Sequence, residues 1–208
     1  VDAPLSADQV ERLNRKLERA NNVTQSSTLT LINREGIALA ASNWRGARSN
    51  VGVDYAFRPY YQQALASGSG SFYGIGLTTG EPGYFLSQAI RDPAGQVQGV
   101  VVIKIALAAL EREWLQTPDI VLASDAHDVG FLASRPQWRY RMLAPLSERD
   151  RRELQATRQY ASQRLLPLQR RVIEPTGSGG VLAEVQMPPL SGQVLWQTLQ
   201  VPESGWRL

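Results

Sequence analysis

The first stretch of the chain carries a helical pattern. Val10, Leu13 and Leu17 recur at spacings of three and four, and Ser6 stands where an N-cap residue is expected. The pattern predicts an amphipathic helix from residue 6 to about residue 27. Two interpretations of this helix stay open. It packs on a sheet, or it is a signalling helix that enters from a membrane.

After residue 27 the apolar positions alternate, which is typical of strands. Strands are predicted over residues 28–33, 37–41, 71–77, 84–90 and 97–105. A short helix is predicted over residues 58–65, with Pro59 in its first turn, and a helical pattern returns over residues 106–115. The connections are too short for the crossovers of a parallel sheet, so the pattern favours an antiparallel sheet flanked by helices.

The motif then begins again. Thr117-Pro118-Asp119 is a plausible boundary, and the hairpin of residues 120–124 and 129–133 resembles the one near residue 30. A helix over residues 147–162 and strands near 168–174, 180–187 and 193–200 complete the second half. We therefore predict an α+β fold, in which a long N-terminal helix is followed by two tandem domains, each an antiparallel sheet flanked by short helices. The predicted segments are residues 1–27, 28–116 and 117–208.

Composition narrows the class of protein. Of 208 residues, 43% are hydrophobic and 20% are charged, as in an ordinary folded domain. The net charge is +3, but the arginines are interleaved with acids and form no basic stripe, so we predict no nucleic-acid partner. The chain has no cysteine, which excludes disulfides, thiolate zinc sites and a cysteine nucleophile. No apolar run approaches the roughly 20 residues that span a bilayer, and we expect an excised fragment whose flanking transmembrane helices lie outside it.

Catalytic and metal-binding patterns are missing from the sequence. His127 is the single histidine, lies in a predicted turn, and has no companion at metal-ligand spacing. The glycine-rich run of residues 74–80 lacks the G-K-[ST] ending of a phosphate loop, and there is no G-x-S-x-G elbow. We therefore predict that this fragment is not an enzyme and that it holds no cofactor and no metal. A hydrolase is a weak alternative.

Two features do suggest ligand chemistry. Lys104, one of only two lysines, lies in a strand that is apolar on both sides, where an unpaired charge has a large desolvation cost. It is either a strand-end lysine that reaches solvent or a cation that binds an anion. Residues 55–61 gather three tyrosines around Arg58, whose planar guanidinium matches a carboxylate. This cluster is either an aromatic core patch or part of an anion site, and two cations on separate elements suit the two ends of a diacid.

Four segments together resemble a known family. They are Ser42-Asn43-Trp44, residues 54–61 (DYAFRPYY), residues 72–87 (FYGIGLTTGEPGYFLS) and residues 99–105. They are similar to the sensor region of DctB-type four-carbon dicarboxylate sensor histidine kinases, a periplasmic double-Cache (tandem PAS-like) domain set between two transmembrane helices. The resemblance is dense over residues 42–115 and thinner over residues 120–208.

The resemblance implies a fold and a set of roles. Residues 28–116 would be the membrane-distal, ligand-binding domain, and residues 117–208 the membrane-proximal one. Arg58 and Lys104 would take the carboxylates of a succinate-, fumarate- or malate-like ligand. The remaining implied ligand-binding residues are Tyr55, Tyr61, Thr78, Thr79, Tyr84 and Ser87. Binding would signal across the membrane to a kinase outside this chain, and a homodimer through the N-terminal helix is expected.

Other functions stay open from the sequence alone. The same fold could sense an amino acid, a monocarboxylate or a tricarboxylate, in a kinase or in a chemoreceptor. An amino-acid sensor would need an acidic group for the ligand ammonium, and Asp54 is the nearby candidate. A ligand-free dimerisation module is the alternative from another class.

Overall fold

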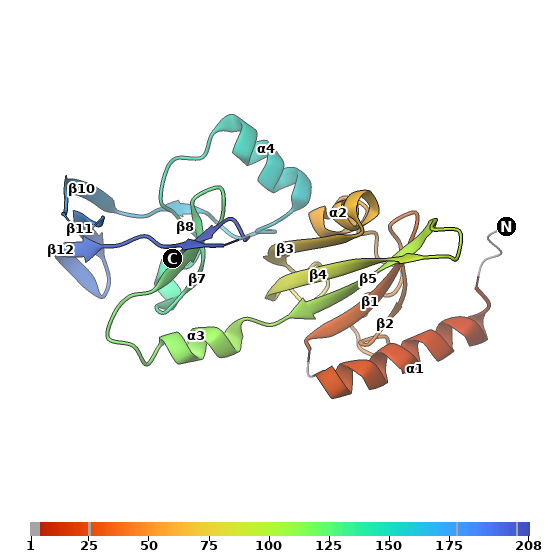
Figure 1. Ribbon diagram of the computed structural model, residues 1–208. Coiled ribbons are helices and arrows are strands. Elements are labelled where there is room, and N and C mark those ends of the chain that lie inside the picture. The colour runs from red at the N-terminus through yellow and green to blue at the C-terminus, as the bar shows by residue number, and fades with distance from the viewer. Residues whose placement is uncertain (1–4, 25, 178, 203) are drawn as a thin grey trace. The chain divides into compact units, whose positions relative to one another are not determined.

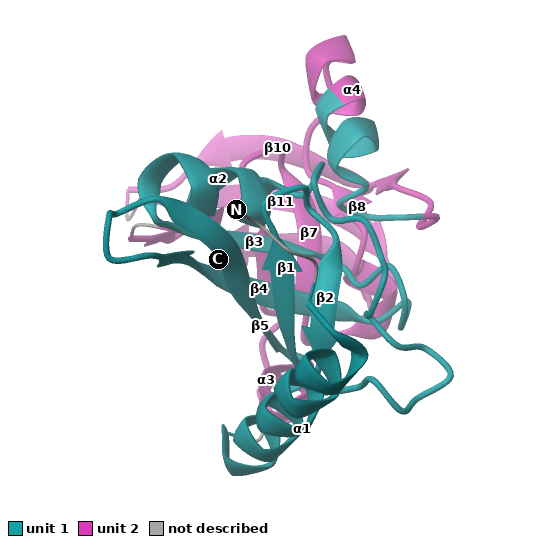
Figure 2. Ribbon diagram, turned by 90° about the vertical axis from the view of Figure 1, so that its right-hand side faces the viewer, with its two compact units in different colours: residues 1–107, 153–161 teal, residues 108–152, 162–208 magenta. Residues whose placement is uncertain are grey.

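The computed structural model describes residues 5–24, 26–177, 179–202 and 204–208. Residues 1–4, 25, 178 and 203, which fall inside the predicted segments, lie outside the described residues. Two compact units are present: residues 1–107 with 153–161 (unit 1), and residues 108–152 with 162–208 (unit 2). Figure 2 colours the two units separately and shows that one helix, α4, changes colour along its length. The domain boundaries drawn from the sequence stay a prediction.

Unit 1 is one antiparallel sheet with a helix on each side (Figure 1). The strands are β1 (Thr28–Asn33), β2 (Ala38–Ala41), β3 (Ser69–Ile75), β4 (Pro82–Arg91) and β5 (Val97–Ile105), in the order β2-β1-β5-β4-β3. The helix α1 (Ala7–Thr24) packs on β1 and β2, and α2 (Pro59–Ser67) packs on β3, β4 and β5. The predicted α+β class is confirmed, and the N-terminal helix lies where the apolar spacing predicts it.

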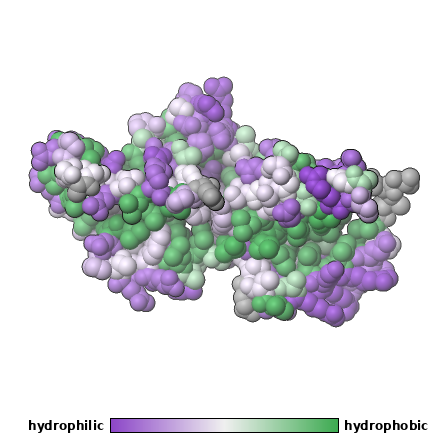
Figure 3. Space-filling view, viewed as in Figure 1, coloured by the Kyte–Doolittle hydropathy of each residue, from purple (hydrophilic) through white to green (hydrophobic). Residues whose placement is uncertain are grey.

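The sequence explains both helices of unit 1. The only buried residue of α1 is Asn14, whose Oδ1 accepts a hydrogen bond of 2.8 Å from the backbone N–H of Ala41. The outward side of this helix is hydrophilic (Figure 3). In α2, Pro59 occupies the first turn, where its missing N–H costs nothing, and Gly68 ends the helix in a left-handed conformation at φ 94°. The α2 side of the sheet holds the main core, in which the rings of Tyr60 and Phe85 stack at 5.2 Å.

Unit 2 contains two sheets. The first has the order β13-β14-β6-β7-β8-β9 and the second the order β10-β11-β12. Its elements are α3 (Ala108–Trp114), β6 (Leu122–Ser124), β7 (Val129–Ala133), a 3-10 turn (Pro136–Trp138), β8 (Arg141–Met142), β9 (Leu166–Pro167), β10 (Arg170–Pro175), β11 (Val181–Met187), β12 (Leu190–Trp196), β13 (Gln200–Val201) and β14 (Trp206–Arg207). The sequence predicts one antiparallel sheet here, whereas the structure has two. In the first of them, β8 and β9 pair in parallel. Trp138, Leu168 and Val185 form the centre of the unit 2 core.

The helix α4 (Glu148–Thr157) begins in unit 2 and ends in unit 1. A helix was predicted to continue to residue 162, but Arg158 and Ala161 both adopt φ 48°, which ends helical geometry. The chain after α4 joins unit 1 directly, since the backbone N–H of Ile75 donates to the carbonyl of Gln159 at 2.8 Å. Segment 153–161 therefore completes a unit whose other residues all precede position 108.

Candidate functional site

A cavity in unit 1 lies on the α2 side of the sheet. Its walls combine strand residues, the start of α2 and the turn between β3 and β4. The described lining residues are Thr28, Thr30, Asn50, Tyr55, Arg58, Tyr60, Gly76, Leu77, Thr78, Thr79, Phe85, Val102 and Lys104. Lys104 pairs across the sheet with Thr28 on one side and Phe85 on the other. Because directly opposed residues share a face of a sheet, these three side chains point to the same side.

Lys104 is a buried cation with little compensation. Its residue is 3% exposed, and its Nζ donates one hydrogen bond of 3.1 Å to Thr79 Oγ1. The nearest carboxylate oxygen, in Glu81, is 3.9 Å away on a side chain that is 68% exposed. Burial lowers the pKa of Lys104, and Glu81 opposes this effect only in part. An ammonium group has three donors, so the site leaves this cation short of acceptors.

Arg58 is the second buried cation, at 1% exposure. Its guanidinium donates to backbone carbonyls: to Ile75 at 2.6 Å, to Thr157 at 3.0 Å and to Arg158 at 3.3 Å. Its Nε is buried without a hydrogen-bond partner among the described residues. Burial lowers the pKa of Arg58, while Tyr60 and Tyr55 oppose this shift. Arg58 thus ties segment 153–161 to the end of β3 and still keeps one donor available.

Hydroxyl and amide groups complete the polar lining. Thr78 Oγ1 donates to Asn50 Oδ1 at 2.6 Å, and Asn50 Nδ2 donates to Thr30 Oγ1 at 2.9 Å. Burial raises the pKa of Tyr55 to about 12, despite a hydrogen bond with Thr78 and the nearby charge of Arg58. Tyr55 is therefore a neutral hydroxyl at physiological pH. Asn50 and Thr30 were not among the predicted site residues.

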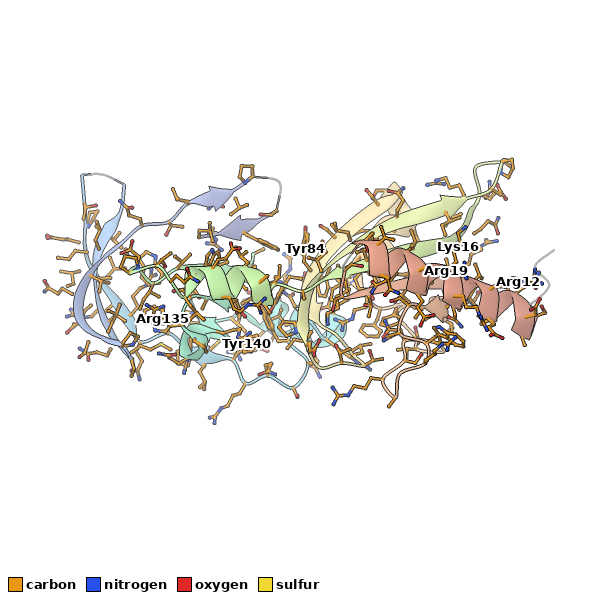
Figure 4. The ribbon with its side chains drawn as sticks, turned by 90° about the horizontal axis from the view of Figure 1, so that it is seen from below. Arg12, Lys16, Arg19, Tyr84, Arg135 and Tyr140 are labelled. Carbon is orange, nitrogen blue, oxygen red and sulfur yellow. The ribbon has the colours of Figure 1, made fainter. Side chains whose placement is uncertain are left out.

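Three predicted site residues do not line the cavity. The hydroxyl of Tyr61 donates to the carbonyls of Arg34 at 2.7 Å and Asn33 at 3.1 Å, so Tyr61 fixes α2 to the turn after β1. Ser87 Oγ donates to the carbonyl of Tyr60 at 2.7 Å and so fixes α2 to β4. Tyr84, which is labelled in Figure 4, pairs with Ile105 and faces the other side of the sheet from Phe85.

No acidic residue is among the described residues that line this cavity. Asp54, the candidate partner for an amino-acid ammonium group, is exposed, and its Oδ1 accepts from the backbone N–H of Ala56 at 2.8 Å. Two buried cations and neutral donors therefore face a space with no carboxylate in its described lining, and the nearest carboxylate, that of Glu81, is on an exposed side chain. Such a lining favours a ligand with negative charge and disfavours one with an ammonium group.

The cavity is small, with a volume of about 20 Å³, enough for a water molecule. A four-carbon diacid needs more space, so a wall must move to admit it. Hydrogen bonds that join the turn over residues 76–81 to the rest of unit 1 include those of Lys104 with Thr79, of Thr78 with Asn50, and of the Arg48 side chain with the carbonyl of Thr79 at 3.1 Å. Side chains that leave these bonds can form equivalent ones with a ligand.

His127 lies outside this site, in unit 2. Its Nδ1 is 3.2 Å from Asp150 Oδ1, and Asp150 also accepts from Ser147 at the start of α4. Within the part of the chain that the structure describes, no cluster of His, Cys, Asp and Glu has the arrangement of a metal site. None of the described helices is long and apolar enough to cross a membrane.

Comparison with known proteins gives consistent relatives, although no family model matches the chain. The C4-dicarboxylate transport sensor protein DctB of Rhizobium meliloti is 32% identical over 209 residues, which cover 99% of this chain and 34% of that protein. The protein of the same name from Pseudomonas aeruginosa is 35% identical over 145 residues, or 70% of this chain and 24% of the relative. The chain therefore spans about a third or less of these curated relatives.

A solved structure agrees with these relatives. The sensor domain of the histidine kinase DctB of V. cholerae superposes with a TM-score of 0.86 at 27% identity, over 97% of this chain and 78% of that one. The periplasmic domain of RsbU from Chlamydia trachomatis has a TM-score of 0.71 at 13% identity, a likeness of fold alone.

Proposed function

Because the chain belongs to the family of DctB-type periplasmic sensor domains, we propose that it senses a small dicarboxylate, of the succinate, fumarate or malate kind, in the unit 1 cavity. The chain itself is a binding module and catalyses no reaction. The whole protein is proposed to be an inner-membrane sensor histidine kinase, in keeping with the names of its relatives.

One observation carries this proposal: Arg58 and Lys104, both nearly inaccessible to solvent, line one cavity whose described lining includes no acidic residue. A buried cation without a paired anion is costly, and a ligand carboxylate compensates it with a charge-assisted hydrogen bond. A dianion compensates both cations at once, whereas a neutral or zwitterionic ligand cannot place one negative charge at each of them.

The lining residues define roles in binding. Lys104 Nζ would bind one carboxylate together with the Thr79 hydroxyl, which it already contacts. Arg58 Nε–H, the donor without a partner among the described residues, would bind the other carboxylate. Thr78 and the neutral Tyr55 hydroxyl would supply further hydrogen bonds, with Phe85 as an apolar wall. Tyr61, Tyr84 and Ser87 would act only by supporting the elements that carry these groups.

Arg58 also supplies a physical connection for signalling. It donates to the carbonyls of Thr157 and Arg158, at the end of α4, and α4 begins in the other unit. A carboxylate bound to Arg58 would change the strength of these bonds and so bias the position of the end of α4. The ligand can shift the equilibrium between two positions of the end of α4 only by as much as it binds more tightly to one of them than to the other. A homodimer through α1 stays a prediction.

A thermal-shift screen of this chain tests the proposal. The ligands are succinate, fumarate and malate, with citrate, acetate and several amino acids as comparisons. A ligand at 100 times its dissociation constant adds about 2.7 kcal/mol of stability, enough to raise the Tm by several degrees. We expect the short diacids to raise the Tm. A shift with amino acids instead, or with no diacid, would contradict the proposed ligand class and leave the fold assignment unaffected.

A further inference from the structure

Unit 2 contains a larger cavity, of about 250 Å³, that the proposed function does not use. Its lining is part apolar and part charged. Leu122, Leu143 and Trp196 supply apolar surface, and Asp128, Arg170 and Arg207 supply the charges. A dry cavity of about 150 Å³ is known to hold a benzene molecule, so this space suits a small organic molecule.

Arg170 is the residue in this cavity that points to a ligand. Its guanidinium lies 4.4 Å from the centroid of the Trp196 ring, and it has no hydrogen bond from its side chain among the described residues. A guanidinium stacked on an aromatic face keeps its N–H groups free for a planar acceptor. The ring beneath it is held in turn by Trp138, at a centroid distance of 6.5 Å. Arg170 is therefore positioned, partly buried and short of acceptors.

The charges around Arg170 do not cancel. Arg207 forms an ion pair with Asp128, with 2.9 Å between Nη2 and Oδ1, so the one carboxylate side chain among the described lining residues is already paired. Burial lowers the pKa of Arg170, and Asp128 only partly offsets this effect. Among the lining side chains, two guanidinium groups and one carboxylate leave an excess of one positive charge. The cavity thus matches a ligand that carries one negative charge and an apolar body.

We propose that the unit 2 cavity is a second ligand site, which binds a small monocarboxylate through Arg170. The carboxylate accepts from the free N–H groups of Arg170, and the apolar part of the ligand contacts Leu122, Leu143 and the Trp196 side chain. This site is independent of the dicarboxylate site in unit 1, because the two cavities share no lining residue.

The test is a titration of the whole chain with benzoate. Calorimetry measures the affinity, and NMR spectra record the indole N–H resonance of Trp196. Benzyl alcohol, of similar size and without charge, is the ligand control. We expect benzoate to shift the Trp196 resonance and to bind at least about tenfold more weakly to Arg170→Gln, since a hydrogen bond to a charged group is lost. Benzyl alcohol should bind weakly to both proteins.

The chain offers a matched control variant. Arg171 is the next residue on β10, but it is 75% exposed and pairs with Glu184 at 2.6 Å on the surface. Arg171→Gln should bind benzoate as the wild type does, and Arg170→Gln should keep its response to succinate, which shows that it folds. The proposal is overturned if benzoate does not bind, if Arg170→Gln binds it unchanged, or if Lys104→Met alone abolishes its binding, which would place benzoate in unit 1. Loss of the succinate response in Lys104→Met bears only on the dicarboxylate site, so the two proposals fail separately.

Discussion

Replacing Lys104 by methionine is the most informative single change in unit 1. Methionine has a similar length and keeps the apolar contacts, and the substitution removes the charged head alone. Burial of an ion costs several kcal/mol. Against this, the one hydrogen bond to Thr79 contributes about 1.5–3 kcal/mol, and the exposed Glu81 contributes about 0–1 kcal/mol. The stabilising and destabilising contributions of the charge are therefore similar in size, and Lys104→Met should unfold with a free energy within about 2 kcal/mol of the wild-type value.

Lys104→Met should have a much larger effect on ligand affinity than on stability. Truncating one partner of a buried charge pair costs about 2–5 kcal/mol in binding free energy, so succinate affinity should fall at least about 30-fold. Urea denaturation measures the stability of the ligand-free protein, and isothermal titration calorimetry measures the affinity. The expected combination is near-normal stability with binding largely lost.

Lys16 provides the matched control, because it is the only other lysine and lies exposed on α1, beside Arg12 and Arg19 (Figure 4). Lys16→Met should leave both quantities unchanged. If Lys104→Met lost more than about 3 kcal/mol of stability, Lys104 would be part of a structural ion pair. If its affinity for succinate were normal, the ligand would not contact Lys104, and the reasoning from its burial would be refuted.

Three further predictions follow from the same contacts. Arg58→Ala should abolish succinate binding and also lower the free energy of unfolding by about 2–4 kcal/mol, since three backbone carbonyls lose a charged donor; urea denaturation with unchanged stability would contradict this. Burial lowers the pKa of Lys104 in the ligand-free protein below the ordinary lysine value of 10.5, so the free energy of unfolding should rise with pH from that lowered pKa towards 10.5. Dicarboxylate affinity should fall over the same window, because the ammonium group loses its proton; calorimetry across this range should show both trends in the wild type and neither in Lys104→Met. His127→Ala should leave succinate affinity unchanged and cost at most about 1 kcal/mol, because its partly exposed pair with Asp150 lies in unit 2; a loss of binding would mean that the site is misplaced.

The strand pattern explains why Lys104 was predictable from the sequence. A lysine between apolar residues on both sides has few ways to reach solvent, and the structure indeed buries it. Tyr84 was harder, because neighbouring residues of a strand face opposite sides and a shift of one position exchanges them. Ser87 shares the face of Phe85, but its hydroxyl bonds to the carbonyl of Tyr60 in α2 and does not line the cavity. Phe85 lines the cavity, and Tyr84, the next residue, does not.

The helix α2 poses the same difficulty. Tyr60 and Tyr61 are adjacent and both are buried, but Tyr60 lines the cavity and Tyr61 bonds to the turn after β1. Composition cannot distinguish them. Asn50 lies in an irregular loop without periodicity, so nothing in the sequence marked it. Two of the three carbonyls that hold Arg58 belong to residues 99 and 100 positions further along the chain, a separation that no local pattern encodes.

That separation has a consequence for the order in which the protein assembles. A nascent chain is made from its N-terminus, and a domain folds as a unit once its residues are available. The sheet of unit 1 is fully synthesised by residue 105, but two acceptors of the buried Arg58 guanidinium come from Thr157 and Arg158. A polypeptide that stopped at residue 107 would hold this cation with one carbonyl in place of three. Unit 1 therefore completes the contacts of its buried arginine only after about half of unit 2 has been synthesised.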